Sequence, residues 1–313
     1  MLNVYRYHIF LIGTLGGIIL LGSFVSFLFK LNHFNLSLSQ IRATDYLAFK
    51  NLERTAPSVW ADRRNWMNVW FVKLAWFWNT LCILLISFTL KRTGGGLRGE
   101  MGKVSVPARL HSWHDVLASK TFLRWIIPTL GWFGLTQWML GAPLLERLHI
   151  ATGAACYANS VSVDESLCRT RAPISTTSHP ILYEQFHPAL QEHAGPIRAG
   201  WHGGFDVSGH TFVLVLSILL LAEMIIPYIP SWMTCHAIPS HLQSHRRVFA
   251  SGSALTRLLN AVALVSTMTL LALWCSMLFS TSLYYHTALE KLGGYLFALL
   301  VWVCMPRESV HLT

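Results

Sequence analysis

Two histidines that lie far apart in the sequence have neighbours suited to phosphoryl chemistry. His210 follows Ser208 and Gly209 in the run GGFDVSGH, and His286 precedes Glu290 in the run YYHTALE. An imidazole can protonate a leaving oxygen or attack phosphorus as a nucleophile. A carboxylate four residues further along a helix shares the face of the histidine and can hold one ring nitrogen, which leaves the other to react. On spacing alone, an ordinary ion pair on a helix surface is the commoner explanation of His286 and Glu290.

The residues before His210 predict the start of a helix. Glycine allows close backbone approach, and a helix N-terminus presents unpaired N–H groups and the positive end of its dipole to an anion. Ser208 and Gly209 are therefore candidates for a phosphate cradle with His210 at its edge. The alternative is that Ser208 is a simple N-cap beside an interfacial histidine, and the residues alone leave both interpretations open.

Lys73 is a further candidate because it lies inside an apolar run. An ionisable side chain at membrane depth is costly and often functional, so Lys73 could bind an anion. The alternative is that its ammonium group extends to the lipid headgroups without a partner. His236, His241 and His245 have no zinc-ligand spacing and no accompanying cysteine pair, so we expect a solvated loop there. The sequence predicts no metal site and no cofactor.

The composition places these candidates in a membrane protein. Of 313 residues, 53% are hydrophobic and 12% are charged, whereas soluble domains carry about 25% charged residues. The net charge of +10 could indicate nucleic acid, but the basic residues lie between apolar runs rather than along one face. We therefore expect membrane lipids and no nucleic acid as partners.

Six apolar stretches are long enough to cross a bilayer, which requires about 20 residues each. They are residues 8–29, 69–90, 124–145, 210–230, 258–280 and 284–305. The predicted fold class is all-α: a polytopic membrane protein of about six transmembrane helices, with residues 1–313 forming a single integral membrane domain.

The distribution of lysine and arginine predicts that both termini are cytosolic. In that orientation the cytosolic segments hold 11 of these residues and the short first lumenal loop holds six, in line with the positive-inside rule. Residues 91–121 then form a basic cytosolic loop, and residues 146–209 form a long lumenal loop. Lys73, His210 and His286 all open their spans from the lumenal side, so we expect them to converge at one face of the membrane.

The predicted lumenal segments carry two further features. Cys156 and Cys168 are the only cysteines in a predicted lumenal loop. A disulfide can persist in that compartment, so the two are a candidate pair. Asn35 begins a glycosylation sequon in the first lumenal loop, although chance sequons are common.

Three segments, at 64–76, 204–210 and 281–291, resemble the FIT (fat-storage-inducing transmembrane) family. The resemblance runs from about 60 to 305, and the polar insert at about 172–198 resembles an elaboration of a fungal-type branch. It implies a six-span endoplasmic-reticulum protein with a helical core like that of lipid phosphate phosphatases. It also implies cleavage of fatty acyl-CoA at its diphosphate to acyl 4′-phosphopantetheine and adenosine 3′,5′-bisphosphate. In the family this activity supports lipid-droplet formation and the balance of phospholipids and endoplasmic-reticulum lipids.

The resemblance assigns roles to three residues. His210 matches the histidine that protonates the leaving group, His286 matches the histidine that attacks phosphorus, and Glu290 stands in the place of the acid that orients it. The chain departs from the phosphatase pattern where Ser280 is followed by Thr281 instead of arginine. The first phosphatase motif, a lysine with a later Arg-Pro pair, is also not recognisable.

These departures leave fewer fixed cations for a phosphate, so we expect Lys73 and the amides after Ser208 to stabilise it. The rival hypothesis is a non-enzymatic protein that binds diacylglycerol or triacylglycerol and promotes lipid-droplet budding, for which the histidines are dispensable. A transporter would place broken helices at mid-membrane. That is less consistent with ionisable groups gathered at one face.

Overall fold

A computed structural model describes the chain over residues 6–31, 58–62, 65–89, 120–137, 142–158, 161–170, 172–175, 177–181, 197–229 and 253–306. Three sequence predictions lie outside these residues: the sequon at Asn35, the basic loop apart from residues 120 and 121, and the histidines at 236, 241 and 245. The insert at 172–198 is described only in part.

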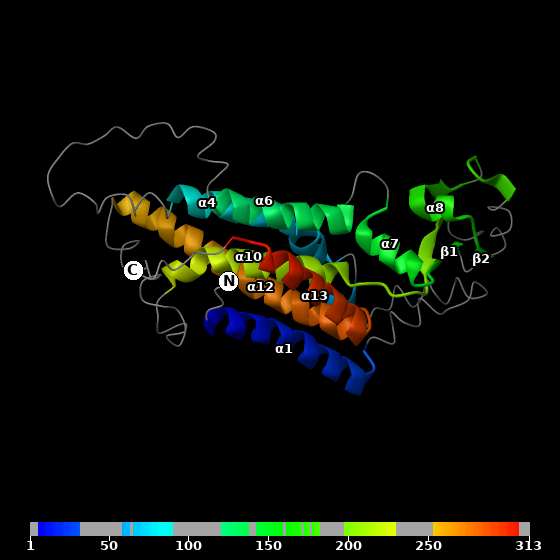
Figure 1. Cartoon of the computed structure of the whole chain (residues 1–313), viewed down its shortest axis with the longest axis horizontal. Helices are drawn as coiled ribbons and strands as arrows, with labels where there is room; N and C mark the ends of the chain where they lie inside the picture. Colours follow the sequence, from blue (N-terminus) through cyan, green and yellow to red (C-terminus); the bar gives the residue numbers. More distant parts are fainter. Residues whose placement is uncertain are drawn as a thin grey trace.

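The described chain is mostly helical, and its long helices lie side by side in a bundle (Figure 1). They are α1 (Arg6–Phe29), α4 (Ala75–Thr89), α6 (Lys120–Trp132), α10 (Gly209–Ile225), α12 (Ala254–Tyr284) and α13 (Ala288–Val303). Helix α10 is the core of the bundle, because almost every residue from Thr211 to Ile225 is buried. Helix α1 has the opposite character: Phe10, Leu20 and Phe27 are each more than 70% exposed. Such large apolar side chains require a covering of lipid or protein.

Each of the six predicted spans overlaps a described helix, but only two of these helices have the length of a full span. Helices α1, with 24 residues, and α12, with 31, are long and apolar enough to cross a membrane on their own, and α4 and α10 are shorter apolar helices. A π-helical turn, η3 (Asn68–Val72), precedes α4, and a 3-10 turn, η6 (Ile226–Tyr228), follows α10. By length and composition, α1 and α12 are typical of membrane-spanning helices.

The third predicted span, 124–145, differs from the structure at both ends. Helix α6 already begins at Lys120 and continues into the π-helical segment η5 (Phe133–Gln137). Leu144 and Leu145 belong instead to a separate helix, α7 (Leu144–Ala151), which is preceded by Pro143. Proline is favoured at a helix start because it lacks the N–H that would have no partner there.

The predicted lumenal loop contains a small folded unit, which we call the cap (residues 142–158, 161–170, 172–175, 177–181 and 197–202). Besides α7 it contains β1 (Ala155–Ala158), β2 (Val161–Ser162), α8 (Glu165–Thr170), β3 (Pro173–Ile174), β4 (Ile197–Arg198) and β5 (Gly200–His202). All pairs are antiparallel, in the orders β2-β1-β5 and β3-β4. The prediction of an all-α chain therefore holds for the bundle but not for the cap.

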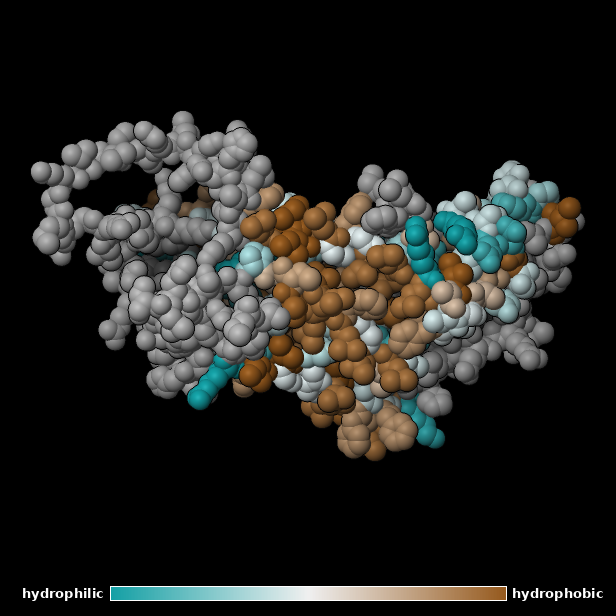
Figure 2. Space-filling model, in the orientation of Figure 1, coloured by the Kyte–Doolittle hydropathy of each residue, from teal (hydrophilic) through white to brown (hydrophobic). Residues whose placement is uncertain are grey.

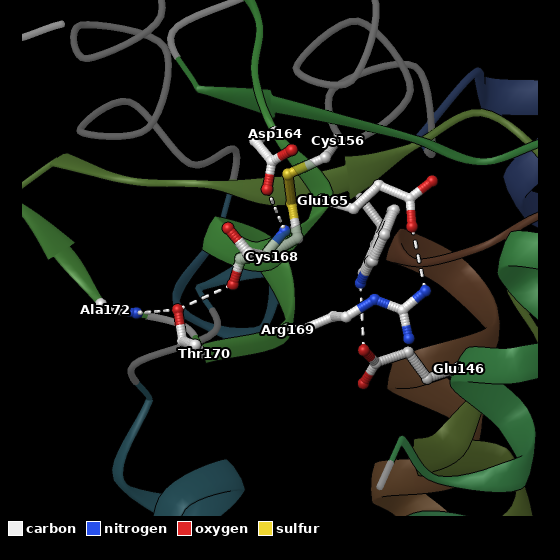
Figure 3. The surroundings of a disulfide bond; sticks show 10 residues. Glu146, Cys156, Asp164, Glu165, Cys168, Arg169, Thr170 and Ala172 are labelled. Atoms are coloured by element: carbon white, nitrogen blue, oxygen red, sulfur yellow. Dashed lines mark hydrogen bonds and ion pairs between the residues drawn. A yellow bond between two sulfur atoms is a disulfide. The ribbon is translucent and has the colours of Figure 1, made fainter.

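The cap lies at the end of the bundle where α10 begins and α12 ends (Figure 1). A disulfide joins Cys156 of β1 to Cys168 of α8 (Figure 3). On the face shown in Figure 2, hydrophobic residues cover the bundle and hydrophilic residues gather over the cap. The polar end of the molecule is thus the end that holds the motif around His210.

Candidate active site

A cavity of about 230 Å³ opens at the cap end of the bundle. It is lined by Trp60, Asn68, Lys73, Asp206, His210, Met277, Ser280, Thr281, Tyr285 and His286. The three ionisable side chains that the sequence analysis expected at one membrane face, Lys73, His210 and His286, therefore border the same space. Of the described residues that line it, Lys73 is the only lysine or arginine.

His210 lies in the first turn of α10 and contacts Asn68 at the start of η3. Its Nε2 lies 3.1 Å from the side-chain oxygen of Asn68. Because an amide oxygen only accepts, this ring nitrogen carries a hydrogen. Asn68 begins the π-helical turn η3, and Lys73 ends it. Such turns occur frequently at functional sites, and here η3 brings both side chains to the cavity.

Ser208 is the N-cap of α10, and its side chain is fully buried. Its hydroxyl oxygen accepts hydrogen bonds from both the amide and the hydroxyl of Thr211, at 3.3 and 2.9 Å. The side chain of Ser208 therefore acts as an N-cap, and its hydroxyl is directed at Thr211. The part of the helix start that remains suited to an anion is the backbone at Gly209 and His210, where the first N–H groups lack intrahelical acceptors.

His286 lies in the break between α12 and α13 and has a φ of 55°. This left-handed conformation is uncommon for a residue with a side chain, and such outliers cluster at functional sites. The break is fixed on both sides. The Tyr285 hydroxyl donates to the carbonyl of Ala61 at 2.7 Å, and Thr287 forms a capping box with Glu290 at the start of α13.

The expected helical face shared by His286 and Glu290 does not exist, because α13 begins only at Ala288. The two side chains are nevertheless close, with His286 Nδ1 3.6 Å from Glu290 Oε2. The same carboxylate oxygen accepts the amide hydrogen of Thr287 at 2.7 Å. The capping box, rather than helical spacing, therefore positions the acid beside the histidine.

Asp206 is a second carboxylate beside His286, and the sequence analysis gave it no role. Its Oδ2 lies 3.7 Å from His286 Nδ1. Two carboxylates facing Nδ1 favour a hydrogen on that nitrogen, which leaves the lone pair on Nε2. Asn68 was missed in the same way. Both residues stand inside the motif segments, but nothing in the sequence shows which elements those segments meet.

The two histidine motifs are held together by direct backbone contact. The amide of Ser208 donates to the carbonyl of Glu290 at 3.1 Å. A Cβ added at Gly294 would lie 2.4 Å from the carbonyl oxygen of Ser208, and one at Gly293 would lie 3.3 Å from the ring of Phe205. Glycine at these positions of α13 therefore allows the close approach to α10 that brings His210 and His286 to one cavity.

The residues at the end of α12 contribute hydroxyl groups rather than a cation. Ser280 and Thr281 line the cavity where the phosphatase pattern has Ser-Arg. The nearby Lys291 is 1% exposed and donates to the carbonyl of Ser282 at 2.7 Å. The ammonium group of Lys291 is therefore bound to the end of α12 and does not line the cavity. Among the described residues, no group of three or more His, Cys, Asp and Glu side chains is placed to hold a metal ion.

Comparisons with known proteins agree with the motifs. The family described as "Fat storage-inducing transmembrane protein" matches residues 56–305. The acyl-coenzyme A diphosphatase fit1 of Schizosaccharomyces pombe is 25% identical over 248 residues, 78% of this chain and 71% of the relative. The acyl-coenzyme A diphosphatase FITM2 of Homo sapiens is 27% identical over 253 residues, 81% of this chain and 73% of the relative. The acyl-coenzyme A diphosphatase FITM2 of Xenopus laevis is 28% identical over 258 residues, 82% of this chain and 75% of the relative.

No solved structure matches the chain. The family match covers well over half of the sequence and includes both histidine motifs, whereas α1 lies outside it. This protein belongs to the FIT family of fat storage-inducing transmembrane proteins.

Proposed function

We propose that this FIT-family protein hydrolyses the diphosphate of fatty acyl-CoA, giving acyl 4′-phosphopantetheine and adenosine 3′,5′-bisphosphate. The observation that carries the proposal is the shared cavity: His210, His286 and Lys73 border one space at the polar end of an apolar bundle. Relatives that match most of the chain are named acyl-coenzyme A diphosphatases. A cavity of about 230 Å³ suits the diphosphate, while the acyl chain extends into the bilayer and the nucleotide toward water.

Lys73 and the N-terminus of α10 would bind the anionic substrate. Lys73 and the backbone amides at Gly209 and His210 would contact the non-bridging oxygens of the diphosphate. Phosphoryl transfer is catalysed mainly by positioning and by fixed charge aimed at these oxygens. The hydroxyl of Thr281 can add a hydrogen bond where related phosphatases carry an arginine, whereas the hydroxyl of Ser280 donates to the carbonyl of Trp60 at 3.4 Å. No step in this scheme requires a metal or a cofactor.

The reaction proceeds in two displacements. In the first, Nε2 of His286 attacks one phosphorus, and the bond from that phosphorus to the bridging oxygen breaks. His210 would enter this step as the imidazolium and give the proton on Nδ1 to the departing oxygen, while its Nε2–H stays hydrogen-bonded to Asn68. In the second, His210 takes a proton from water as the water attacks the phosphorus, the P–N bond breaks, and His286 is restored. Asn68 holds the ring of His210, and Glu290 orients that of His286.

The proposed setting is the endoplasmic-reticulum membrane, crossed six times, with both termini cytosolic and the cavity open to the lumen. The cap supports this orientation, because it carries the disulfide between Cys156 and Cys168 and lies at the cavity end of the bundle. Disulfides persist in the oxidising lumen and are rare in the cytosol. In this membrane the activity would support lipid-droplet formation and phospholipid balance.

The direct test is product analysis. Purified full-length protein in detergent is incubated with oleoyl-CoA, and both products are quantified by mass spectrometry. We expect acyl 4′-phosphopantetheine and adenosine 3′,5′-bisphosphate in equal amounts. Release of free CoA and oleate, or no turnover, would overturn the proposal. Full rescue of cells lacking the protein by the double variant His210→Ala/His286→Ala would instead favour binding of diacylglycerol or triacylglycerol as the essential activity.

A further inference from the structure

We infer that Asp206 is a second positioning residue for His286, acting together with Glu290, and that His149 of the cap holds Asp206 in place. The inference rests on the proposed function, because it concerns the nucleophile of that reaction. It differs from the family resemblance, which assigns the orienting role to Glu290 alone.

The carboxylate of Asp206 faces two imidazoles. Its Oδ2 lies 3.7 Å from His286 Nδ1, and its Oδ1 lies 3.9 Å from His149 Nδ1. Both distances exceed a hydrogen bond but are within the range of charge attraction. Catalytic hydrogen bonds are often long in substrate-free proteins and tighten when the substrate binds. Asp206 is therefore placed to bridge the cap and the nucleophile.

His149 is the partner on the cap side. Its side chain is 11% exposed, and its Nε2 lies 2.7 Å from the carbonyl oxygen of Gly203. A carbonyl only accepts, so Nε2 carries a hydrogen. Nδ1 is the ring nitrogen that faces Asp206, and a hydrogen on it would make that contact attractive. The neighbouring His202 does not supply a competing cation, because burial, and then the charge of His149, lower the pKa of His202.

The backbone before Asp206 is fixed against α7 and the turn that follows it. Gly203 and Gly204 have φ values of 81° and 62°. A Cβ at Gly204 would lie 2.6 Å from the carbonyl oxygen of His149. The amide of Phe205 donates to the hydroxyl of Thr152 at 2.7 Å. The cap thus determines where the carboxylate of Asp206 lies.

A second carboxylate beside His286 has a physical reason, because Glu290 is already engaged in the capping box. Its Oε2 accepts the amide hydrogen of Thr287 and is also the oxygen nearest to His286. Asp206 offers Nδ1 a second acceptor. An additional negative charge on the cavity wall would repel a diphosphate, and an imidazole that shares a proton with Asp206 would offset that charge. The cap residue therefore makes a second orienting carboxylate compatible with an anionic substrate.

The test measures kcat and KM on oleoyl-CoA for Asp206→Asn, Glu290→Gln, the double variant and Asp206→Glu, all as purified full-length protein. Glutamine retains the capping box at Glu290. Asp206 is 55% exposed, so its replacement leaves the fold intact. The matched control is Asp164→Asn, an exposed cap residue whose Oδ1 accepts the amide hydrogen of Ser166 at 2.9 Å.

Each single variant should lower kcat about tenfold with little change in KM, and Asp206→Glu should regain most of the loss. The double variant should lose about 10³–10⁴-fold, more than the product of the single losses, because no acceptor then orients the ring. His149→Gln, which keeps a donor for Gly203, should lower kcat and raise KM when Asp206 is present and change neither in the Asp206→Asn background.

Three results distinguish the outcomes. Wild-type kcat in Asp206→Asn, or a double variant no slower than Glu290→Gln, would show that Glu290 orients His286 alone. An equal effect of His149→Gln in both backgrounds would remove His149 from the inference. Absence of acyl-CoA turnover in the wild-type protein would defeat the proposed function itself.

Discussion

The backbone amide of Ser208 donates a hydrogen bond to the backbone carbonyl of Glu290 at 3.1 Å. One residue caps the helix that carries His210, and the other belongs to the capping box that follows His286. The contact therefore joins the two motifs directly through main-chain atoms, without a side chain between them. It explains how two histidines on separate helices reach one cavity.

Gly294→Ala should disrupt this contact. The added methyl group would lie 2.4 Å from the carbonyl oxygen of Ser208, and overpacking of this kind costs about 1–3 kcal/mol. We expect a lower unfolding temperature in detergent and reduced turnover. The matched control is Gly17→Ala on α1, where a Cβ meets nothing within 4 Å. It should be neutral or stabilising, because alanine favours a helix over glycine. Equal unfolding temperatures for the two variants would contradict the packing argument.

Replacing Cys156 and Cys168 by serine should loosen the cap. The disulfide links residues separated by 12 positions, and loss of a native disulfide typically costs about 2–4 kcal/mol. Limited trypsin digestion should cut the cap faster, and turnover should fall because the cap positions Asp206. Cys304→Ser is the control, since Cys304 is an exposed free cysteine. An unchanged digestion half-life in the double serine variant would count against a structural role for the disulfide.

A buried contact between His8 and Glu223 joins α1 to α10 at the end of α10 remote from His210. His8 Nε2 lies 2.7 Å from Glu223 Oε1, and the two side chains are 1% and 8% exposed. The hydroxyl of Tyr7 donates to Glu223 Oε2 at 3.3 Å. Removing one partner leaves the other polar group buried without its contact, which costs about 1–3 kcal/mol, whereas replacing both by apolar residues is often tolerated.

His8→Ala should therefore lower the unfolding temperature strongly, and His8→Leu/Glu223→Leu should recover much of the loss. The comparison is Arg169→Ala, which breaks an exposed pair with Glu165 worth less than about 1 kcal/mol. If His8→Ala were no more destabilising than Arg169→Ala, the contact between His8 and Glu223 would not stabilise the packing of α1 on the bundle.

Asn68→Leu should lower kcat about 10–100-fold, because His210 loses the acceptor for its Nε2–H, which fixes the orientation of its ring. Asn68→Asp keeps an acceptor and should be less impaired. Steady-state kinetics on oleoyl-CoA separates the two variants. Asn79→Leu is the control: Asn79 donates to the hydroxyl of Ser217 at 2.7 Å inside the bundle, so its loss should reduce stability and leave kcat near wild type. Equal kcat values in Asn68→Leu and wild type would exclude this role.

The helices and the candidate histidines were predictable from the sequence because both are local signals. Long apolar runs indicate helices such as α1 and α12, and histidine next to Ser-Gly indicates a helix start. The cap was not predictable, because strands of two to four residues such as β1 and β2 carry too little periodicity. Its sheet joins strands that are distant in sequence, such as β1 and β5.

The carboxylates show the same limit within the site. Glu290 was selected for sharing a helical face with His286, but the structure places the histidine outside that helix and brings the acid close through a capping box. Asp206 was overlooked because its relation to His286 depends on how the cap folds onto the bundle. When a side chain contacts a residue of another helix or loop, the residue spacing within its own segment does not indicate that contact.

The two-histidine mechanism is tested most directly by kcat on oleoyl-CoA for His210→Ala and His286→Ala, measured as purified full-length protein beside His179→Ala. The control histidine lies in the cap, where its Nδ1 contacts the hydroxyl of Ser178 at 3.0 Å. We predict a loss of at least about 10³-fold in each of the first two variants, with unfolding temperatures near wild type, and unchanged turnover in the third. Turnover near the wild-type rate in either His210→Ala or His286→Ala would contradict the mechanism.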